Sequence, residues 1–62
     1  MTPARVEAQG GGLWRVVWEG REVMRDESHG VACAVAWALN NPEAWEPTEA
    51  YEIAEQARRV QS

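Results

Sequence analysis

The sequence predicts an α+β fold in which a three-stranded antiparallel β-meander packs against a buried helix, a short helical turn and a C-terminal helix. Three observations predict it. The first half of the chain holds short β-branched and aromatic segments separated by glycine turns. The second half holds an alanine-rich apolar run and a segment with apolar residues at helical spacing. A length of 62 residues leaves room for one core, so we expect residues 1–62 to form a single βββαα domain.

The strand half is expected to contain three strands. Residues 4–8 alternate small or apolar side chains with charged ones, which is typical of a half-buried strand. A flexible connection, Gly10-Gly11-Gly12, leads to residues 13–18, which are rich in valine and tryptophan. Glu19-Gly20 then favours a two-residue turn, after which residues 21–25 return as the third strand.

This turn sets the register and the two faces of the sheet. It places Trp18 opposite Arg21, Val16 opposite Val23, and Trp14 opposite Arg25. The face expected to receive the helices consists of Val6, Trp14, Val16, Trp18 and Val23. The opposite face holds Leu13, Val17 and Met24 among charged side chains. We expect a monomer, and a structural protein that dimerises through Leu13, Val17 and Met24 is the alternative.

The first helix is expected to follow Asp26 and Ser28, either of which can cap its first amides. Residues 31–39 are apolar all round, which predicts a helix buried on most sides with Cys33 inside the core. Asn40-Asn41-Pro42 ends it, since asparagine tolerates a left-handed cap and proline lacks the amide that would continue the helix.

The remaining residues predict a short turn and a last helix. Residues 41–45 resemble a new helix start with proline at its first position, pinned by Trp45. Thr48 then caps the C-terminal helix. Its buried stripe is expected to consist of Ala50, Ile53, Ala54, Ala57 and Val60.

Catalytic and metal-binding patterns are lacking. His29 is the one histidine, and its neighbours Asp26 and Ser28 suit helix capping better than a triad, which needs a chain of hydrogen bonds across space. Cys33 has no second cysteine or histidine at zinc-ligand spacing, and Gly10-Gly11-Gly12 lacks the features of a phosphate loop. We therefore expect a protein that is not an enzyme and has no cofactor and no metal.

Composition indicates a cytoplasmic protein. The single cysteine cannot form an internal disulfide, and no apolar run approaches the roughly 20 residues that cross a bilayer, so we expect no membrane association. The sequence pI is about 4.8 and the net charge is −4.

One charge pattern stands out in the second half. A glutamate occupies every third position with no intervening lysine or arginine: Glu43, Glu46, Glu49, Glu52 and Glu55. A step of three residues turns by about 60° relative to whole helical turns, so the last three curve around the C-terminal helix. This row is either a solvated face or a surface on which a basic partner docks.

The small size, the βββαα order, the acidic pI, the lack of catalytic groups and the glutamate row together resemble the small acidic inhibitors made by phages, of which anti-CRISPR proteins are the best known. The resemblance implies a DNA mimic that occupies the basic nucleic-acid-binding surface of a CRISPR effector complex in the bacterial host cell. It implies that Glu43, Glu46, Glu49, Glu52 and Glu55 face arginines and lysines of that partner.

The alternative from the residues themselves is a small sheet-based nucleic-acid-binding or regulatory module using Arg15, Arg21 and Arg25. Residues 1–31 carry five acidic residues against four arginines, a net charge of −1. A phosphate-binding surface relies on net positive charge, so we expect no direct binding of nucleic acid.

Overall fold

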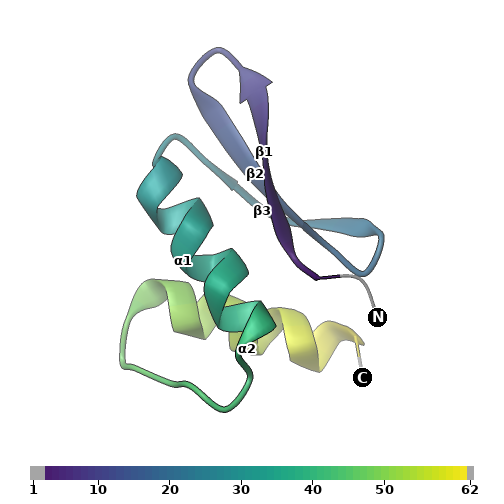
Figure 1. Ribbon diagram of the computed structural model, residues 1–62, viewed down its shortest axis with the longest axis vertical. Coiled ribbons are helices and arrows are strands. Elements are labelled where there is room, and N and C mark those ends of the chain that lie inside the picture. The colour runs from purple at the N-terminus through teal and green to yellow at the C-terminus, as the bar shows by residue number, and fades with distance from the viewer. Residues whose placement is uncertain (1–2, 62) are drawn as a thin grey trace.

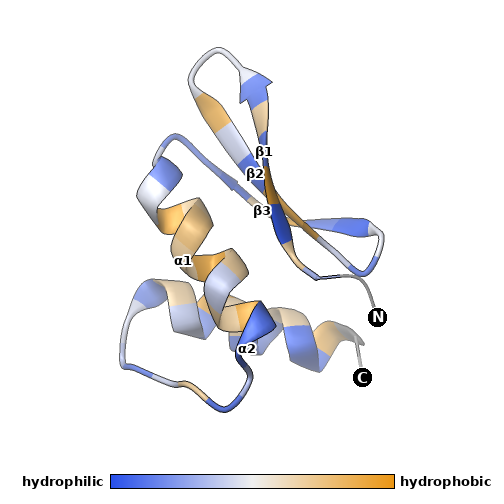
Figure 2. Ribbon diagram, viewed as in Figure 1, coloured by the Kyte–Doolittle hydropathy of each residue, from blue (hydrophilic) through white to orange (hydrophobic). Residues whose placement is uncertain are grey.

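The computed structural model describes residues 3–61, and it has the α+β fold that the sequence predicts (Figure 1). Its elements in chain order are β1 (Arg5–Gly10), β2 (Leu13–Trp18), β3 (Arg21–Asp26), α1 (His29–Asn40) and α2 (Glu49–Gln61). The strands form one antiparallel sheet in the order β1-β2-β3. Helix α1 packs on the sheet, mainly against β2, and α2 packs on α1. Apolar residues concentrate in α1 and in the middle of the sheet, where the two meet (Figure 2).

Both hairpins close through left-handed backbone conformations. Gly11 and Gly12, between β1 and β2, have φ angles of 61° and 80°. Glu19 and Gly20, between β2 and β3, have φ angles of 53° and 78°, which confirms the predicted two-residue turn. Such turns match the twist of the paired strands, but the left-handed region is costly for a residue with a Cβ atom. Glu19 is therefore a strained position.

The second hairpin contains one extra residue, so the predicted register holds for the first two pairs, Trp18 with Arg21 and Val17 with Glu22, and is wrong beyond them. Trp18 faces Arg21 as expected, but Val16 faces Met24 rather than Val23. Farther along, Trp14 faces Asp26 rather than Arg25. A β-bulge on the β3 side causes the shift, because two residues of one strand then oppose a single residue of the other.

The bulge changes the faces of the sheet as well. Val23 and Met24 both pack against the core, Met24 beside Val16, whereas the uninterrupted alternation had placed Met24 on the opposite face. Val17 does lie away from the helices, but it is only 8% exposed. Met24 therefore does not share the opposite face with Leu13 and Val17, as the alternative of a dimer through these three residues assumed.

The core is built mainly from small side chains. Its buried members are Ala4, Val16, Ala32, Val35, Ala36, Ala38, Leu39, Ala50, Ala54 and Ala57. Val16 and Val35 are the largest of the described side chains to be fully buried. No tryptophan belongs to this set: Trp14 and Trp18 are half-buried at its margin, and Trp37 and Trp45 are exposed.

Polar side chains define both ends of α1. The Ser28 hydroxyl accepts a hydrogen bond from the Val31 amide at 3.2 Å, and an Asp26 carboxylate oxygen accepts one from the Ser28 amide at 2.7 Å. Both predicted capping residues are therefore used. At the other end Asn41 has a φ of −130°, so the expected left-handed cap is wrong. Its side chain instead donates to the Trp37 carbonyl at 2.7 Å.

Helix α1 is buried or half-buried on most sides, as expected, but one of its faces is open to solvent, so the expectation that Cys33 lies inside the core is wrong. Cys33 is exposed, and its Sγ lies 3.3 Å from Nε2 of His29 one turn earlier. The His29 ring in turn contacts the Trp14 indole, with ring centroids 4.2 Å apart. Trp37, one turn after Cys33, is 51% exposed.

The segment between the helices is less regular than the sequence suggested. The Ala44 amide donates to the Asn41 carbonyl at 3.0 Å, which closes a single turn, but no helix forms before Glu49. Trp45 is 59% exposed and does not pin this turn to the core.

Helix α2 buries a narrower stripe than predicted. Ala50, Ala54 and Ala57 are buried as expected and Ile53 is partly buried, but Val60 is 59% exposed. The first helical hydrogen bond runs from the Glu52 amide to the Thr48 carbonyl at 3.1 Å, which agrees with Thr48 as the cap.

Two polar contacts hold the ends of the fold together. The Asn40 side chain accepts from the Ala4 amide at 2.8 Å and donates to the Ala4 carbonyl at 3.1 Å, which joins the end of α1 to the start of β1. The guanidinium of Arg58 on α2 donates to the Ala38 carbonyl, near the end of α1. A cation is favourable at this position because the last carbonyls of a helix carry partial negative charge.

Replacing Glu19 by asparagine should stabilise the protein by about 0.5–1 kcal/mol, because asparagine adopts the left-handed conformation more readily than other residues with a side chain. Urea unfolding followed by tryptophan fluorescence measures the change. Glu19→Gln is the matched control, since it removes the same charge and keeps the strain. Equal stability of the two variants would refute the conformational explanation.

The exposure of Cys33 has a direct chemical test. Its thiol should react with Ellman's reagent in the folded protein at a rate within about tenfold of the rate in the urea-unfolded chain. Rates slower by several orders of magnitude in the folded state would mean that the thiol is buried after all.

Candidate functional site

The glutamates singled out in the sequence surround the first half of α2. Glu43 and Glu46 lie in the connection that precedes it, and both are exposed. Glu49 and Glu52 are exposed in its first turn, and Glu55 is half-buried and forms an ion pair with Arg59 one turn later. The Glu55–Arg59 pair has the i, i+4 spacing that places opposite charges side by side on a helix.

Successive glutamates line the same hollows of the molecular surface. Glu46 and Glu49 line a hollow of about 660 Å³ between α1 and the start of α2. Glu49 and Glu52 line a groove of about 370 Å³ between α2 and β3. Glu52 and Glu55 line a smaller one of about 250 Å³ that Trp45 also lines. We call the four residues Glu46, Glu49, Glu52 and Glu55 the acidic surface. Glu43 lines none of these three hollows.

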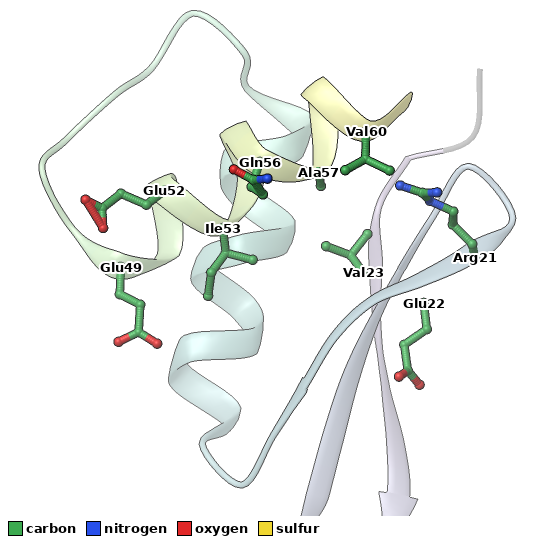
Figure 3. A pocket seen from close by; sticks show the side chains of 9 residues that line it. All are labelled: Arg21, Glu22, Val23, Glu49, Glu52, Ile53, Gln56, Ala57 and Val60. Carbon is green, nitrogen blue, oxygen red and sulfur yellow. The ribbon is translucent and has the colours of Figure 1, made fainter. Parts of the chain in front are cut away.

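The groove between α2 and β3 has an apolar interior and charged ends (Figure 3). Val23 of β3 and Ile53 of α2 lie on its two sides. Glu49 and Glu52 stand at the start of α2, and the Arg21 guanidinium reaches toward the other end. Helix α2 packs on α1 rather than on the sheet, which leaves this groove uncovered.

Two exposed tryptophans share the hollows with the carboxylates. Trp37 lines the hollow that contains Glu46 and Glu49, and Trp45 lines the one that contains Glu52 and Glu55. Sequence reasoning assigned both indoles to the core. Half-exposed tryptophans are frequent at the centres of protein–protein interfaces, because their large flat rings bury much area when a partner covers them.

Tyr51 lines the same hollow as the Glu46 carboxylate. Partial burial raises the pKa of the Tyr51 hydroxyl, and the interaction with the Glu46 carboxylate raises it further. The same tyrosine ring meets the Trp37 indole edge to face, with ring centroids 6.2 Å apart and an interplanar angle of 68°. Glu46 therefore lies in the same hollow as an aromatic wall made by Tyr51 and Trp37.

Helix electrostatics accounts for part of this charge distribution. Glu49 and Glu52 lie in the first turn of α2 and Arg58 and Arg59 in its last turn, so each sign of charge meets the opposite end of the helix dipole. This stabilises the helix whether or not a partner binds. It does not explain why two tryptophans are exposed beside the same carboxylates.

The arginines proposed for a nucleic-acid-binding sheet are largely engaged with glutamates. Five side chains form a ladder of ion pairs across the face of the sheet that points away from the helices: Arg5, Glu7, Arg15, Glu22 and Arg25. Arg15 lies 2.8 Å from Glu7 and 3.7 Å from Glu22, and Arg25 lies 2.8 Å from Glu22. A phosphate would have to compete with these carboxylates. The third arginine, Arg21, lines the groove beside α2.

The ladder changes the acidity of its carboxyl groups. Hydrogen bonds from Arg15 and then Arg5 lower the pKa of Glu7 below its ordinary value of 4.5. The hydrogen bond from Arg25 likewise lowers the pKa of Glu22, and Arg15 adds to the effect.

Within residues 3–61, no three or more histidine, cysteine, aspartate or glutamate side chains come together as a metal-binding group. Neither helix in this part of the chain is long and apolar enough to span a bilayer.

Comparison with known protein families, curated proteins and solved structures found no match to this chain. Functional inference therefore depends on the geometry of the acidic surface.

The ion-pair ladder should make stability depend on pH. Because folding lowers the pKa of Glu7 and Glu22, their pairing stabilises the fold above the ordinary glutamate value of 4.5. That stabilisation is lost as the pH falls through the lowered values. The difference in unfolding free energy between the protein and its Arg15→Gln variant should therefore shrink between about pH 7 and pH 3. A difference that is constant over this range, measured by urea unfolding, would contradict the role of Arg15.

Proposed function

We propose that this protein is a non-enzymatic inhibitor whose acidic surface docks on a basic, nucleic-acid-binding surface of another protein. The observation that carries the proposal is the shared lining of adjoining hollows by the four carboxylates and two half-exposed tryptophans. Carboxylates attract a basic partner over a distance, and the indoles supply apolar area once contact is made.

The specific form of the proposal is an inhibitor of the anti-CRISPR type. A CRISPR effector complex holds duplex DNA on rows of lysine and arginine, and a strip of carboxylates satisfies the same side chains. The net charge of −4 is small for a molecule that replaces DNA by charge alone. Binding must therefore also draw on apolar contacts, and Trp37 and Trp45 stand where such contacts would form.

Location of the charges supports docking by the helical half rather than by the sheet. The carboxylates of the sheet, Glu7 and Glu22, already neutralise arginines of the same chain. Among the described residues, Glu55 is the one member of the acidic surface that forms an ion pair, with Arg59. An incoming cation therefore meets carboxylates with unused hydrogen-bonding capacity at Glu49 and Glu52.

The proposal can be tested with a panel of purified CRISPR effector complexes whose binding to duplex DNA is followed by fluorescence anisotropy. The protein should prevent DNA binding by at least one complex, and rising salt should relieve the inhibition. Failure to inhibit any complex would overturn the anti-CRISPR form of the proposal.

Two matched double variants separate the acidic surface from net charge. Glu49→Gln with Glu52→Gln, and Glu19→Gln with Glu27→Gln, each remove two exposed negative charges. The first should weaken inhibition by about threefold to tenfold, and the second should leave it within about twofold. Equal effects would mean that overall charge, and not this surface, governs binding.

A further inference from the structure

The hollow between α1 and the start of α2 combines three kinds of lining. Its interior is apolar, with Val31 and Ala34 from α1 and Ala50 from α2. Trp37 and Tyr51 form an aromatic wall, and Glu46 and Glu49 supply carboxylates. At about 660 Å³ it has room for a large side chain of a partner.

The aromatic wall is held in place by contacts within the protein. Trp37 stands on α1, and its indole packs edge to face with the Tyr51 ring on α2. Because 51% of Trp37 is exposed, much of its surface is available to a ligand. Glu46 and Glu49 line the same hollow, so carboxylates lie near this wall. The aromatic part of the site is thus arranged before any ligand arrives, which reduces the entropy lost on binding.

The combination of apolar, aromatic and acidic groups in this hollow favours some side chains of a partner over others. An apolar side chain would leave two carboxylates without a counter-charge, and an acidic one would be repelled. A lysine satisfies the charge but presents a compact, strongly hydrated ammonium. An arginine has a planar, weakly hydrated guanidinium that stacks on an indole while its N–H groups donate to carboxylates. Its three-carbon stem suits the apolar interior.

We propose that this hollow binds the side chain of an arginine from the partner protein, with the guanidinium against Trp37 and within reach of Glu46 and Glu49. This inference rests on the proposed function, because it assumes that the partner is a basic protein. It goes further in naming arginine over lysine and in assigning the contact to one hollow of the acidic surface.

Blocked tetra-arginine and tetra-lysine peptides are suitable probes, since they carry equal charge. Titration into the 15N-labelled protein gives both affinities and the shifts of the indole N–H resonances, which tryptophan variants assign. The arginine peptide should bind about twofold to fivefold more tightly than the lysine peptide and should shift the Trp37 resonance most. Equal affinities, or shifts confined to other tryptophans, would overturn the inference.

Matched variants locate the preference for arginine. Trp37→Leu should reduce the affinity for the arginine peptide to that for the lysine peptide. Trp45→Leu, which replaces the other exposed tryptophan beside carboxylates, should preserve the difference. Tyr51→Phe keeps the ring and removes the hydroxyl, so it should reduce the preference only in part. A preference that survives Trp37→Leu would exclude this hollow as its origin.

The peptide titrations and the DNA-binding assay distinguish the docking proposal from the proposal of an arginine-binding hollow. If both peptides bind equally and the Glu49, Glu52 double variant weakens both, the acidic surface stands and the arginine hollow fails. If neither peptide binds, the hollow is refuted by this measurement alone, whereas the docking proposal is judged by the DNA-binding assay.

Discussion

The close contact of α1 with α2 through alanine side chains is the constraint on which the rest of the structure depends. Ala50, Ala54 and Ala57 are the buried residues of α2, and alanines also form most of the buried set of α1. Helices that meet through alanine approach to the short end of the usual range of interaxial distances, near 8 Å. No indole fits into so narrow a space, so the large aromatic side chains lie at the margin of the core or outside it.

Because small side chains fill the core, the large apolar side chains are left at the surface. A chain of 62 residues with four tryptophans has ample apolar area, yet in the part that the structure describes only two fully buried side chains are as large as valine. Trp37 and Trp45 are instead displayed near the carboxylates of the acidic surface. Stability then draws on polar contacts at the edges, where Asn40 joins α1 to β1 and Arg58 joins α2 to α1.

The parts of the structure that depend on local chemistry could be predicted from the sequence. The alternation of side chains identifies the strands, Glu19-Gly20 identifies the turn, and the Ser28 cap identifies the helix start.

Features that are set by tertiary packing could not be predicted from the sequence. The bulge that directs Val23 and Met24 to the same side leaves no mark in the pattern of a six-residue strand. An all-apolar run likewise does not indicate which side of α1 faces solvent, and this is why Cys33 and Trp37 were wrongly assigned to the core. The three-residue spacing did indicate a curved row of glutamates, whereas the hollows between them arise only when α2 packs on α1.

The bulge in β3 has one more consequence, for the behaviour of the exposed sheet edge. With the order β1-β2-β3, β3 has one unpaired side, where free amides and carbonyls would ordinarily serve as a template for strands from other molecules. An extra residue bends the strand and increases its twist, so that these groups no longer form a straight row. The charged arginine and glutamate side chains along β3 also disfavour the pairing of this edge with a strand of another molecule. The geometry of the backbone thereby disfavours the pairing of a strand from another molecule at the β3 edge.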